Sequence, residues 1–226
     1  MPAIRVTRAV VALCLAASAA AVHAQAPKTP PPPPPSSSEL HEKLTQISQN
    51  PAAHAAAIQR GQKSAAVCRH CHGVGGNSVM PDVPNLASQN SAYLLEQMNK
   101  FSVGQRKSSR FMEGMIRALS PDERIDIALF LASQPVARQT VKGGQDVTGK
   151  QLYAKLCLAC HGATGSGSAT IPRLAGQQIE YVEDSLKRYR KGDGERIDPR
   201  MAGYTRNLSD ADIRHLAAYL ATLQHP

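Results

Sequence analysis

Two short segments of this chain combine a pair of cysteines with a histidine that follows at once. Both have the form Cys-x-x-Cys-His, and they span residues 68–72 and 157–161. Cysteines three positions apart lie on one side of a helical turn, so both thiols can add to the vinyl groups along one porphyrin edge while the next residue turns its imidazole toward the iron. This spacing is typical of covalent haem c attachment, and it occurs twice. The predicted attachment residues are Cys68, Cys71, Cys157 and Cys160, and the predicted iron ligands are His72 and His161.

Three other uses of cysteine pairs fit this sequence less well. A zinc site would bring its two Cys-x-x-Cys pairs within about 15–20 residues of each other, and these two pairs are far more widely separated. A thioredoxin-like redox pair needs a βαβ setting, and neither motif lies near a strand-rich run. A structural disulfide would not require the histidine. Two covalently bound haem c groups are therefore the predicted cofactors.

A methionine follows each motif at the same distance and is the predicted second axial ligand. Met112 and Met201 each stand forty residues after the histidine of their motif. Met115 is a rival for the first site, but it aligns with a tyrosine in the second half of the chain, whereas Met112 aligns with Met201. A thioether from each half therefore completes both sites in the same way.

The other methionines and histidines that could bind iron are expected to have different roles. Met98 aligns with a leucine on an apolar helix stripe, so we expect it in the core. His70, inside the first attachment motif, is expected on the surface. A bis-histidine site that uses His54 or His215 is conceivable, but the methionines explain both halves at once.

The two halves of the chain repeat each other beyond the motifs. The tetrapeptide Pro-x-Leu-Ala that begins at Pro84 recurs at Pro172. A metal-bound histidine usually donates its other ring nitrogen to an acceptor, and these two proline carbonyls are candidates, although either could equally be an ordinary loop proline. Arg117 and Arg206 also align. They could pair with haem carboxylates, or they could be solvated residues before a helix cap.

The first 24 residues have the character of a cleaved secretory signal. Arg5 and Arg8 precede a short apolar run at residues 9–21, and the expected cleavage site, Val22-His23-Ala24, follows it. The run is shorter than the roughly 20 apolar residues that span a bilayer comfortably, which disfavours a retained anchor. Residues 25–38 are rich in proline and serine and predict an extended, disordered linker.

The chain is basic, with a formal net charge of +9, and it contains no tryptophan. Lysines and arginines gather before each predicted methionine ligand, among them Arg106 in the first half and Arg196 in the second. These runs could steer an acidic partner or an anionic membrane surface. Favourable cations at helix C-termini are an equally good explanation. No nucleic-acid partner is expected.

The sequence between the motifs predicts helices joined by loops rich in glycine and proline. Ser38 is expected to cap the first helix, Ser120 forms a capping box with Glu123, and Ser209 is expected to cap the last helix. The fold class is all-α, with two tandem domains that are each built around one haem. The predicted divisions are a signal peptide at 1–24, a linker at 25–38, an N-terminal helical extension at 39–60, a first domain at 61–134, an inter-domain linker at 135–148 and a second domain at 149–226.

Over about residues 61 to 225 the chain resembles a di-haem class I c-type cytochrome, most closely cytochrome c4. Three patterns carry the resemblance, each present twice: Cys-x-x-Cys-His-Gly, Pro-x-Leu-Ala-x-Gln followed by Tyr, and Met-x-Gly before Leu-Ser. The resemblance implies two similar cytochrome c domains with their haems close together. It also implies the proline carbonyl contacts of Pro84 and Pro172, and soluble or membrane-associated periplasmic electron transfer, often to a terminal oxidase.

The expected function is electron transfer in the periplasm rather than catalysis. With a histidine and a methionine on each iron, neither haem offers a position to a substrate. Redox proteins, such as a membrane oxidoreductase or a terminal oxidase, are the expected partners, and peripheral membrane association stays open. A cytochrome subunit of a periplasmic dehydrogenase is the main alternative. A di-haem peroxidase or a thiosulfate dehydrogenase would need one haem with an open or switchable sixth position, against which the matched methionines argue.

Overall fold

The computed structural model describes residues 35–137, 146–192 and 195–224. The predicted signal peptide, most of the predicted linker before the first helix and most of the predicted inter-domain linker lie outside these ranges. The described residues form helices and loops and contain no strand, as the all-α prediction requires. Residues 35–226 belong to one compact unit.

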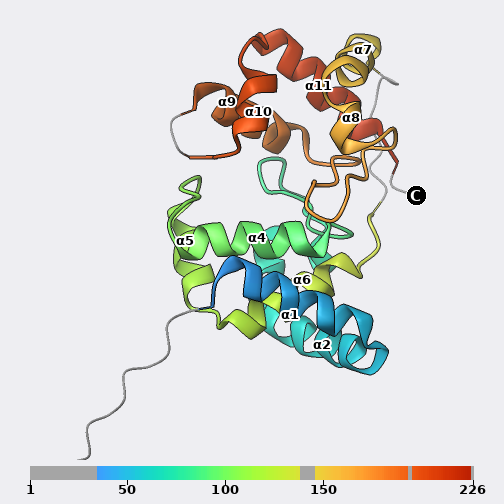
Figure 1. Cartoon of the computed structure of the whole chain (residues 1–226). Coiled ribbons are helices and arrows are strands. Elements are labelled where there is room, and N and C mark those ends of the chain that lie inside the picture. The colour runs from blue at the N-terminus through green and yellow to red at the C-terminus, as the bar shows by residue number, and fades with distance from the viewer. Residues whose placement is uncertain (1–34, 138–145, 193–194, 225–226) are drawn as a thin grey trace, which may run out of the picture. The chain divides into compact units, whose positions relative to one another are not determined.

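Helices follow one another in the same order in the two halves (Figure 1). The first half contains α1 (Ser37–Gln49), α2 (Pro51–Ser64), the 3₁₀ turn η1 (Ala65–Val67), α3 (Arg69–His72), a second 3₁₀ turn η2 (Val74–Gly76), α4 (Ser91–Ser102), α5 (Arg110–Arg117) and α6 (Pro121–Ala132). The second half contains α7 (Val147–Leu156), α8 (Leu158–His161), α9 (Ile179–Lys191), α10 (Pro199–Thr205) and α11 (Asp210–Thr222). Among the residues that the structure describes, helix α1 has no counterpart in the second half.

Capping boxes, each formed by two polar residues three positions apart, stabilise the starts of α1, α6 and α11. Ser120 and Glu123 form the predicted capping box at the start of α6, and Ser209 caps α11 as predicted, with Asp212 completing a second box. The predicted cap of α1 is wrong by two residues. Ser36, not Ser38, accepts from the backbone of Glu39, because a capping box needs the acidic residue at the third helical position.

In each half, the long helix that precedes the attachment motif crosses the last helix at a glycine. Gly61 of α2 lies against the backbone of Asp126 in α6, and Gly149 of α7 lies in the same way against His215 in α11. A side chain at either glycine would meet the backbone of the partner helix, so close packing of the two helices depends on its absence.

Each half has its own hydrophobic core. Helices α4 and α6 supply most of the first core, which includes Met98 as predicted, and Leu40 and Leu44 of α1 extend it. Helices α7, α9 and α11 supply most of the second. In the described part of the chain, no helix has both the length and the hydropathy required to cross a membrane.

Candidate haem sites

The two attachment motifs form the same short helical turn. In each turn the N–H of the histidine donates to the carbonyl of the first cysteine, at 2.9 Å in α3 and 3.0 Å in α8. The turn ends at a glycine, Gly73 or Gly162, with φ of 75° or 78°. This left-handed conformation strains most other residues, which explains why a glycine follows each histidine. The helical turn places the two cysteines of each motif on one side, as the spacing predicted.

Each motif histidine is buried and donates to the carbonyl of a proline. His72 Nδ1 lies 3.0 Å from Pro84 O, and His161 Nδ1 lies 3.0 Å from Pro172 O. A carbonyl oxygen can only accept, so Nδ1 carries the proton and Nε2 keeps the lone pair that a metal needs. Burial lowers the pKa of both histidines by more than the hydrogen bonds raise it, which favours the neutral imidazole.

Two of the four motif cysteines have a pKa raised above its ordinary value. Burial raises the pKa of Cys157 to about 11 and also raises the pKa of Cys68. Reactive cysteines have a lowered pKa, so these thiols are unlike those of a thioredoxin-like pair. Cys71 is half-buried and Cys160 is exposed.

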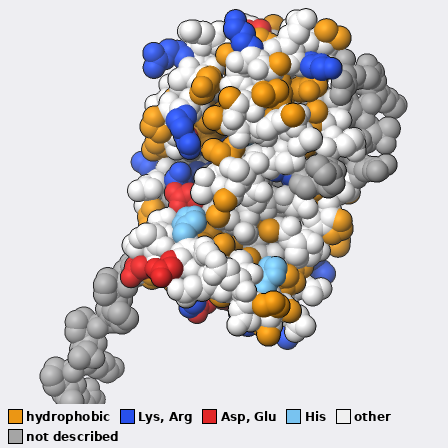
Figure 2. Space-filling view, turned by 45° about the vertical axis from the view of Figure 1, so that its right-hand side comes forward, with side chains coloured by type: hydrophobic (Ala, Val, Ile, Leu, Met, Phe, Trp, Pro, Cys, Tyr) orange, Lys and Arg blue, Asp and Glu red, His pale blue; other side chains and the backbone are white. Residues whose placement is uncertain are grey.

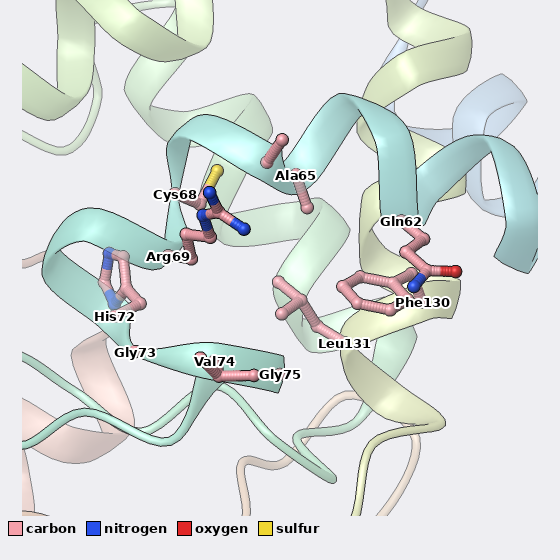
Figure 3. Close-up of a pocket in the computed structure, with 12 residues that line it drawn as sticks. Gln62, Ala65, Cys68, Arg69, His72, Gly73, Val74, Gly75, Phe130 and Leu131 are labelled. Atoms are coloured by element: carbon pink, nitrogen blue, oxygen red, sulfur yellow. The ribbon is translucent and has the colours of Figure 1, made fainter.

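A cavity of about 200 Å³ lies beside the first attachment turn (Figure 3). Cys68 and His72 border it from the turn, and Phe130 and Leu131 border it from the end of α6. This space lies where a porphyrin bound through Cys68 and His72 would be attached, and Phe130 and Leu131 make part of its lining apolar. The residues that would hold the haem are the four cysteines and the two histidines.

Both predicted methionine ligands stand at the third position of a short helix. Ser109 caps α5 and accepts from Met112 N at 3.3 Å, and Asp198 caps α10 and accepts from Met201 N at 3.3 Å. Both methionine side chains are half-buried, and that of Met112 packs against the first core. The two caps are a matched feature that our sequence reasoning missed, although Ser and Asp before a helix are a known signal.

The other histidines considered as ligands have different surroundings. His70 is exposed, as predicted, and its Nδ1 lies 3.1 Å from Val67 O. His215 Nδ1 lies 2.9 Å from the carboxylate of Asp146, which holds this ring at the crossing of α11 with the start of α7. His54 lies half-buried on α2.

The two aligned arginines, which the sequence left as either partners of haem carboxylates or solvated residues, lie on the surface. Arg117 is exposed, donates to the carbonyl of Ser102 at 3.2 Å and forms an ion pair with Glu113 at 3.7 Å. Arg206 is also exposed. Neither is buried against an attachment turn.

Two other arginines, which our sequence reasoning assigned to basic surface runs, are buried instead. Arg196 is 6% exposed and donates to the hydroxyls of Tyr181 at 2.9 Å and Tyr93 at 2.8 Å. Arg106 is 9% exposed and lies 3.4 Å from the hydroxyl of Tyr181. Burial acts to raise the pKa of Tyr181, but the two guanidinium groups outweigh it and lower that pKa to about 7.

This arginine–tyrosine cluster joins the two halves of the chain. Among the described residues, the polar side chains that Arg196 contacts are hydroxyls rather than carboxylates. A buried guanidinium is stabilised by an anion, and the carboxylates of a haem are anions of suitable geometry. The signal that could have identified the cluster is the alignment of Tyr93 with Tyr181 in the repeat.

Comparison with known proteins agrees with this geometry. The family model for cytochrome c matches residues 58–135 and 147–224. Cytochrome c4 of Pseudomonas aeruginosa is 35% identical over 186 residues, which cover 76% of this chain and 91% of the relative. A thiosulfate dehydrogenase electron acceptor of Stutzerimonas stutzeri is 30% identical over 195 residues, which cover 79% of this chain and 83% of the relative.

Solved structures give the same result. Reduced recombinant cytochrome c4 from Pseudomonas stutzeri superposes with a TM-score of 0.68 at 32% identity, covering 74% of this chain and 98% of that one. Thiosulfate dehydrogenase from Marichromatium purpuratum superposes with a TM-score of 0.64 at 26% identity, covering 73% of this chain but 40% of that one. The chain therefore belongs to the cytochrome c family, as a di-haem electron carrier of the cytochrome c4 type with two tandem domains that each bind a covalent haem c.

Proposed function

We propose that this protein carries electrons in the periplasm and that each iron is held between a histidine and a methionine. The ligands are His72 with Met112 in the first domain and His161 with Met201 in the second. Bound haem supplies one-electron chemistry between ferric and ferrous iron. With a histidine and a methionine as ligands, both axial positions would be filled, so electrons would pass through the haem edge and no substrate would bind the metal.

The two sites are built from the same parts at the same places, and this duplication is the main support for the proposal. Each histidine lies 3.0 Å from a proline carbonyl, and each methionine N–H lies 3.3 Å from a capping side chain. A peroxidase or dehydrogenase that used one haem for catalysis would need one site to differ. Methionine ligation also raises the reduction potential, as suits a carrier late in a respiratory chain.

Substitution of the methionines tests the ligand assignment. In the ferric protein, a weak sulfur-to-iron absorption band near the red end of the spectrum reports methionine ligation. We expect Met112→Ala and Met201→Ala each to remove about half of this band and the double variant to remove all of it, since each domain supplies one thioether. Met115→Leu is the matched control and should leave the band unchanged. A band of full intensity in both alanine variants would refute the assignment.

Exposed hydrophobic side chains next to the attachment turns support a role in contacting redox partners. Val67 is 48% exposed and Val74 is 84% exposed beside the first motif, and Leu158 inside the second is 42% exposed. Figure 2 shows one face on which basic side chains lie among hydrophobic ones, mainly over the second domain. Apolar contact near the haem edge together with basic charge suits an acidic redox partner.

The electron donor and acceptor define two versions of the proposed function. In the first version, this chain would accept electrons from a membrane oxidoreductase and pass them to a terminal oxidase. In the second, a periplasmic dehydrogenase would use this chain as its electron acceptor. Likeness to a thiosulfate dehydrogenase electron acceptor favours testing the second version directly. Purified holoprotein should be reduced in stopped-flow mixing by its true donor at a rate that falls as salt screens the basic face. A rate that does not depend on salt would argue against electrostatic docking.

The location of the protein depends on its first residues. We propose that residues 1–24 direct export and are removed, so that residues 25–38 link the folded part to the new N-terminus. The mass of protein from a periplasmic extract should equal that of a chain beginning at Gln25 plus two haem groups. An intact N-terminus recovered with the membrane fraction would show that the segment is retained as an anchor.

A further inference from the structure

The peptide group between Pro84 and Asn85 makes hydrogen bonds on both of its sides. Its carbonyl accepts from His72 Nδ1 at 3.0 Å. Its N–H donates to Gln177 Oε1 at 2.7 Å, although Gln177 belongs to the second domain. Gln177 Nε2 in turn donates to Asn85 O at 3.0 Å, so one side chain holds both backbone groups of Asn85.

The second domain repeats this arrangement with the roles exchanged. The carbonyl of Pro172 accepts from His161 Nδ1 at 3.0 Å, and the N–H of Arg173 donates to Gln89 Oε1 at 2.7 Å. Gln89 Nε2 donates back to Arg173 O at 3.0 Å. Each motif histidine is therefore connected, through one peptide group, to a glutamine from the other domain.

The orientation of both amides is determined by their surroundings. Gln177 Oε1 also accepts from the N–H of Gln178 at 3.0 Å, and Gln89 Oε1 from the N–H of Asn90 at 3.1 Å. Each amide oxygen thus faces two N–H groups and each amide nitrogen faces a carbonyl. A flipped amide would place donors against donors, which a buried site does not tolerate.

These hydrogen bonds are buried, so the loss of one has an energetic cost. The two glutamines are 3% and 4% exposed, and Asn85 and Arg173 are 2% and 1% exposed. Water has little access to replace a lost partner there, so removal of the amide leaves a peptide N–H unsatisfied. Hydrogen bonds in a chain polarise one another, so a peptide whose N–H donates is a stronger acceptor at its carbonyl. A stronger acceptor draws the imidazole proton further and makes the other ring nitrogen a better ligand.

We propose that each domain adjusts the redox centre of the other through this chain of hydrogen bonds. Gln177 is a positioning residue for His72, and Gln89 is a positioning residue for His161. The inference rests on the proposed function, in which these two histidines bind iron. A more basic imidazole favours the ferric state, so the glutamines hold the two potentials lower than they would otherwise be. Any partner that loosens the contact between the domains would raise both reduction potentials.

The test is a crossed pair of substitutions in the holoprotein. Gln177→Met keeps the length of the side chain but removes both hydrogen bonds with Asn85 and the one accepted from the Gln178 N–H. At a fixed ambient potential near the midpoint, we expect it to raise the ferrous-to-ferric ratio of the first haem by about two- to fivefold, the effect of one weakened hydrogen bond, and to leave the second haem unchanged. Gln89→Met should raise the ferrous-to-ferric ratio of the second haem and leave the first haem unchanged. Spectroelectrochemistry, with each haem assigned through the methionine variants, measures both ratios.

Gln178→Met is the matched control. Gln178 Nε2 donates across the same domain contact to the carbonyl of Ser78 at 2.6 Å and lies 3.4 Å from Asn85 Oδ1, but its side chain makes no hydrogen bond to the peptide group between Pro84 and Asn85. A general loosening of the domains would shift both haems in this variant as well. If Gln177→Met does not accumulate, Gln177→Asn shortens the side chain by one methylene and breaks the same bonds with a smaller change in volume.

Slower hydrogen exchange of the Asn85 backbone N–H in the wild type than in the Gln177 variants would confirm that its hydrogen bond to Gln177 exists in solution. Equal shifts at both haems, or no shift at either with the methionine bands intact, would overturn the inference while leaving the proposed function in place. Loss of the proposed ligation itself would appear separately, as a methionine band that persists in Met112→Ala and Met201→Ala.

Discussion

Helices α7 and α11 cross at Gly149, and we predict that Gly149→Ala destabilises the protein although alanine is the better helix former. A Cβ atom at this position would lie 2.7 Å from Tyr219 Cβ and closer still to the carbonyl oxygen of His215. Carbon atoms in contact normally stand about 3.5–4.0 Å apart. The helices would therefore have to separate by about 1 Å, because a backbone carbonyl cannot rotate aside as the end of a long side chain can.

The magnitude follows from two opposing effects. Replacing glycine by alanine inside a helix stabilises it by about 1 kcal/mol, because the unfolded chain loses conformational freedom. Overpacking of a well-packed contact costs about 1–3 kcal/mol, and a clash with backbone belongs at the upper end of that range. We therefore expect Gly149→Ala to lower the free energy of unfolding by about 2 kcal/mol.

Gly203→Ala is the matched control in the same domain. Gly203 lies inside α10, and a Cβ there would meet nothing within 4 Å. It stands two residues after Met201, so its Cβ points away from the side of the helix that carries the methionine. We expect this variant to raise the free energy of unfolding by about 0.5–1 kcal/mol. The same chemical change should thus have opposite signs at the two glycines.

Guanidinium unfolding of the ferric holoprotein, followed by far-ultraviolet circular dichroism and by the Soret band, measures both variants. The Soret signal reports whether the haem environment is lost with the helices. A Gly149→Ala variant as stable as the wild type or more stable would show that α7 and α11 are not in close contact in solution.

The other predictions concern ion pairs. Asp126 is buried and pairs at 2.7 Å with Arg60, whose side chain is 57% exposed. Arg60→Ala should lower the free energy of unfolding by about 1–3 kcal/mol, because it leaves a buried carboxylate unpaired. Lys43 pairs with Asp122 on the surface, so Lys43→Ala should change the free energy of unfolding by at most about 0.5 kcal/mol. Equal effects in denaturant titrations would contradict this. The hydrogen bond from His215, together with one from the backbone, lowers the pKa of Asp146 below its ordinary 3.8. The stabilisation that ionised Asp146 contributes is therefore fully present above pH 3.8, and it disappears as the pH falls through the lower pKa of the folded state. The advantage of the wild type over Asp146→Asn should therefore shrink below about pH 4, and a constant difference from pH 6 to pH 2 would disprove the link.

Features that depend on neighbours along the chain were predictable from the sequence. The capping box of Ser120 and Glu123 needs only a spacing of three residues, and the helical turn of each attachment motif needs only its five residues and a glycine. The repeat also separated Met98, which lies in the core, from the methionines that we propose as ligands. The cap of α1 was misplaced within a run of serines, because several of them could serve and only the position of Glu39 decides.

Features that depend on contact between the two domains were not predictable. Arg106 and Arg196 were assigned to a solvated basic run, but the tyrosines that surround Arg196 come from both halves of the chain. Gln89 and Gln177 were visible as aligned residues, yet nothing in the sequence indicated that each reaches across to the other domain.

The sequence by itself determined the helical class, the duplicated domain and the residues that attach the two haems, because these follow from spacings shorter than a few helical turns or from repetition along the chain. Only the tertiary structure decided which polar side chains are buried between the domains and which peptide groups they hold. Burial between surfaces that are about ninety residues apart in sequence depends on how two folded bodies meet, and local residue patterns do not encode that geometry.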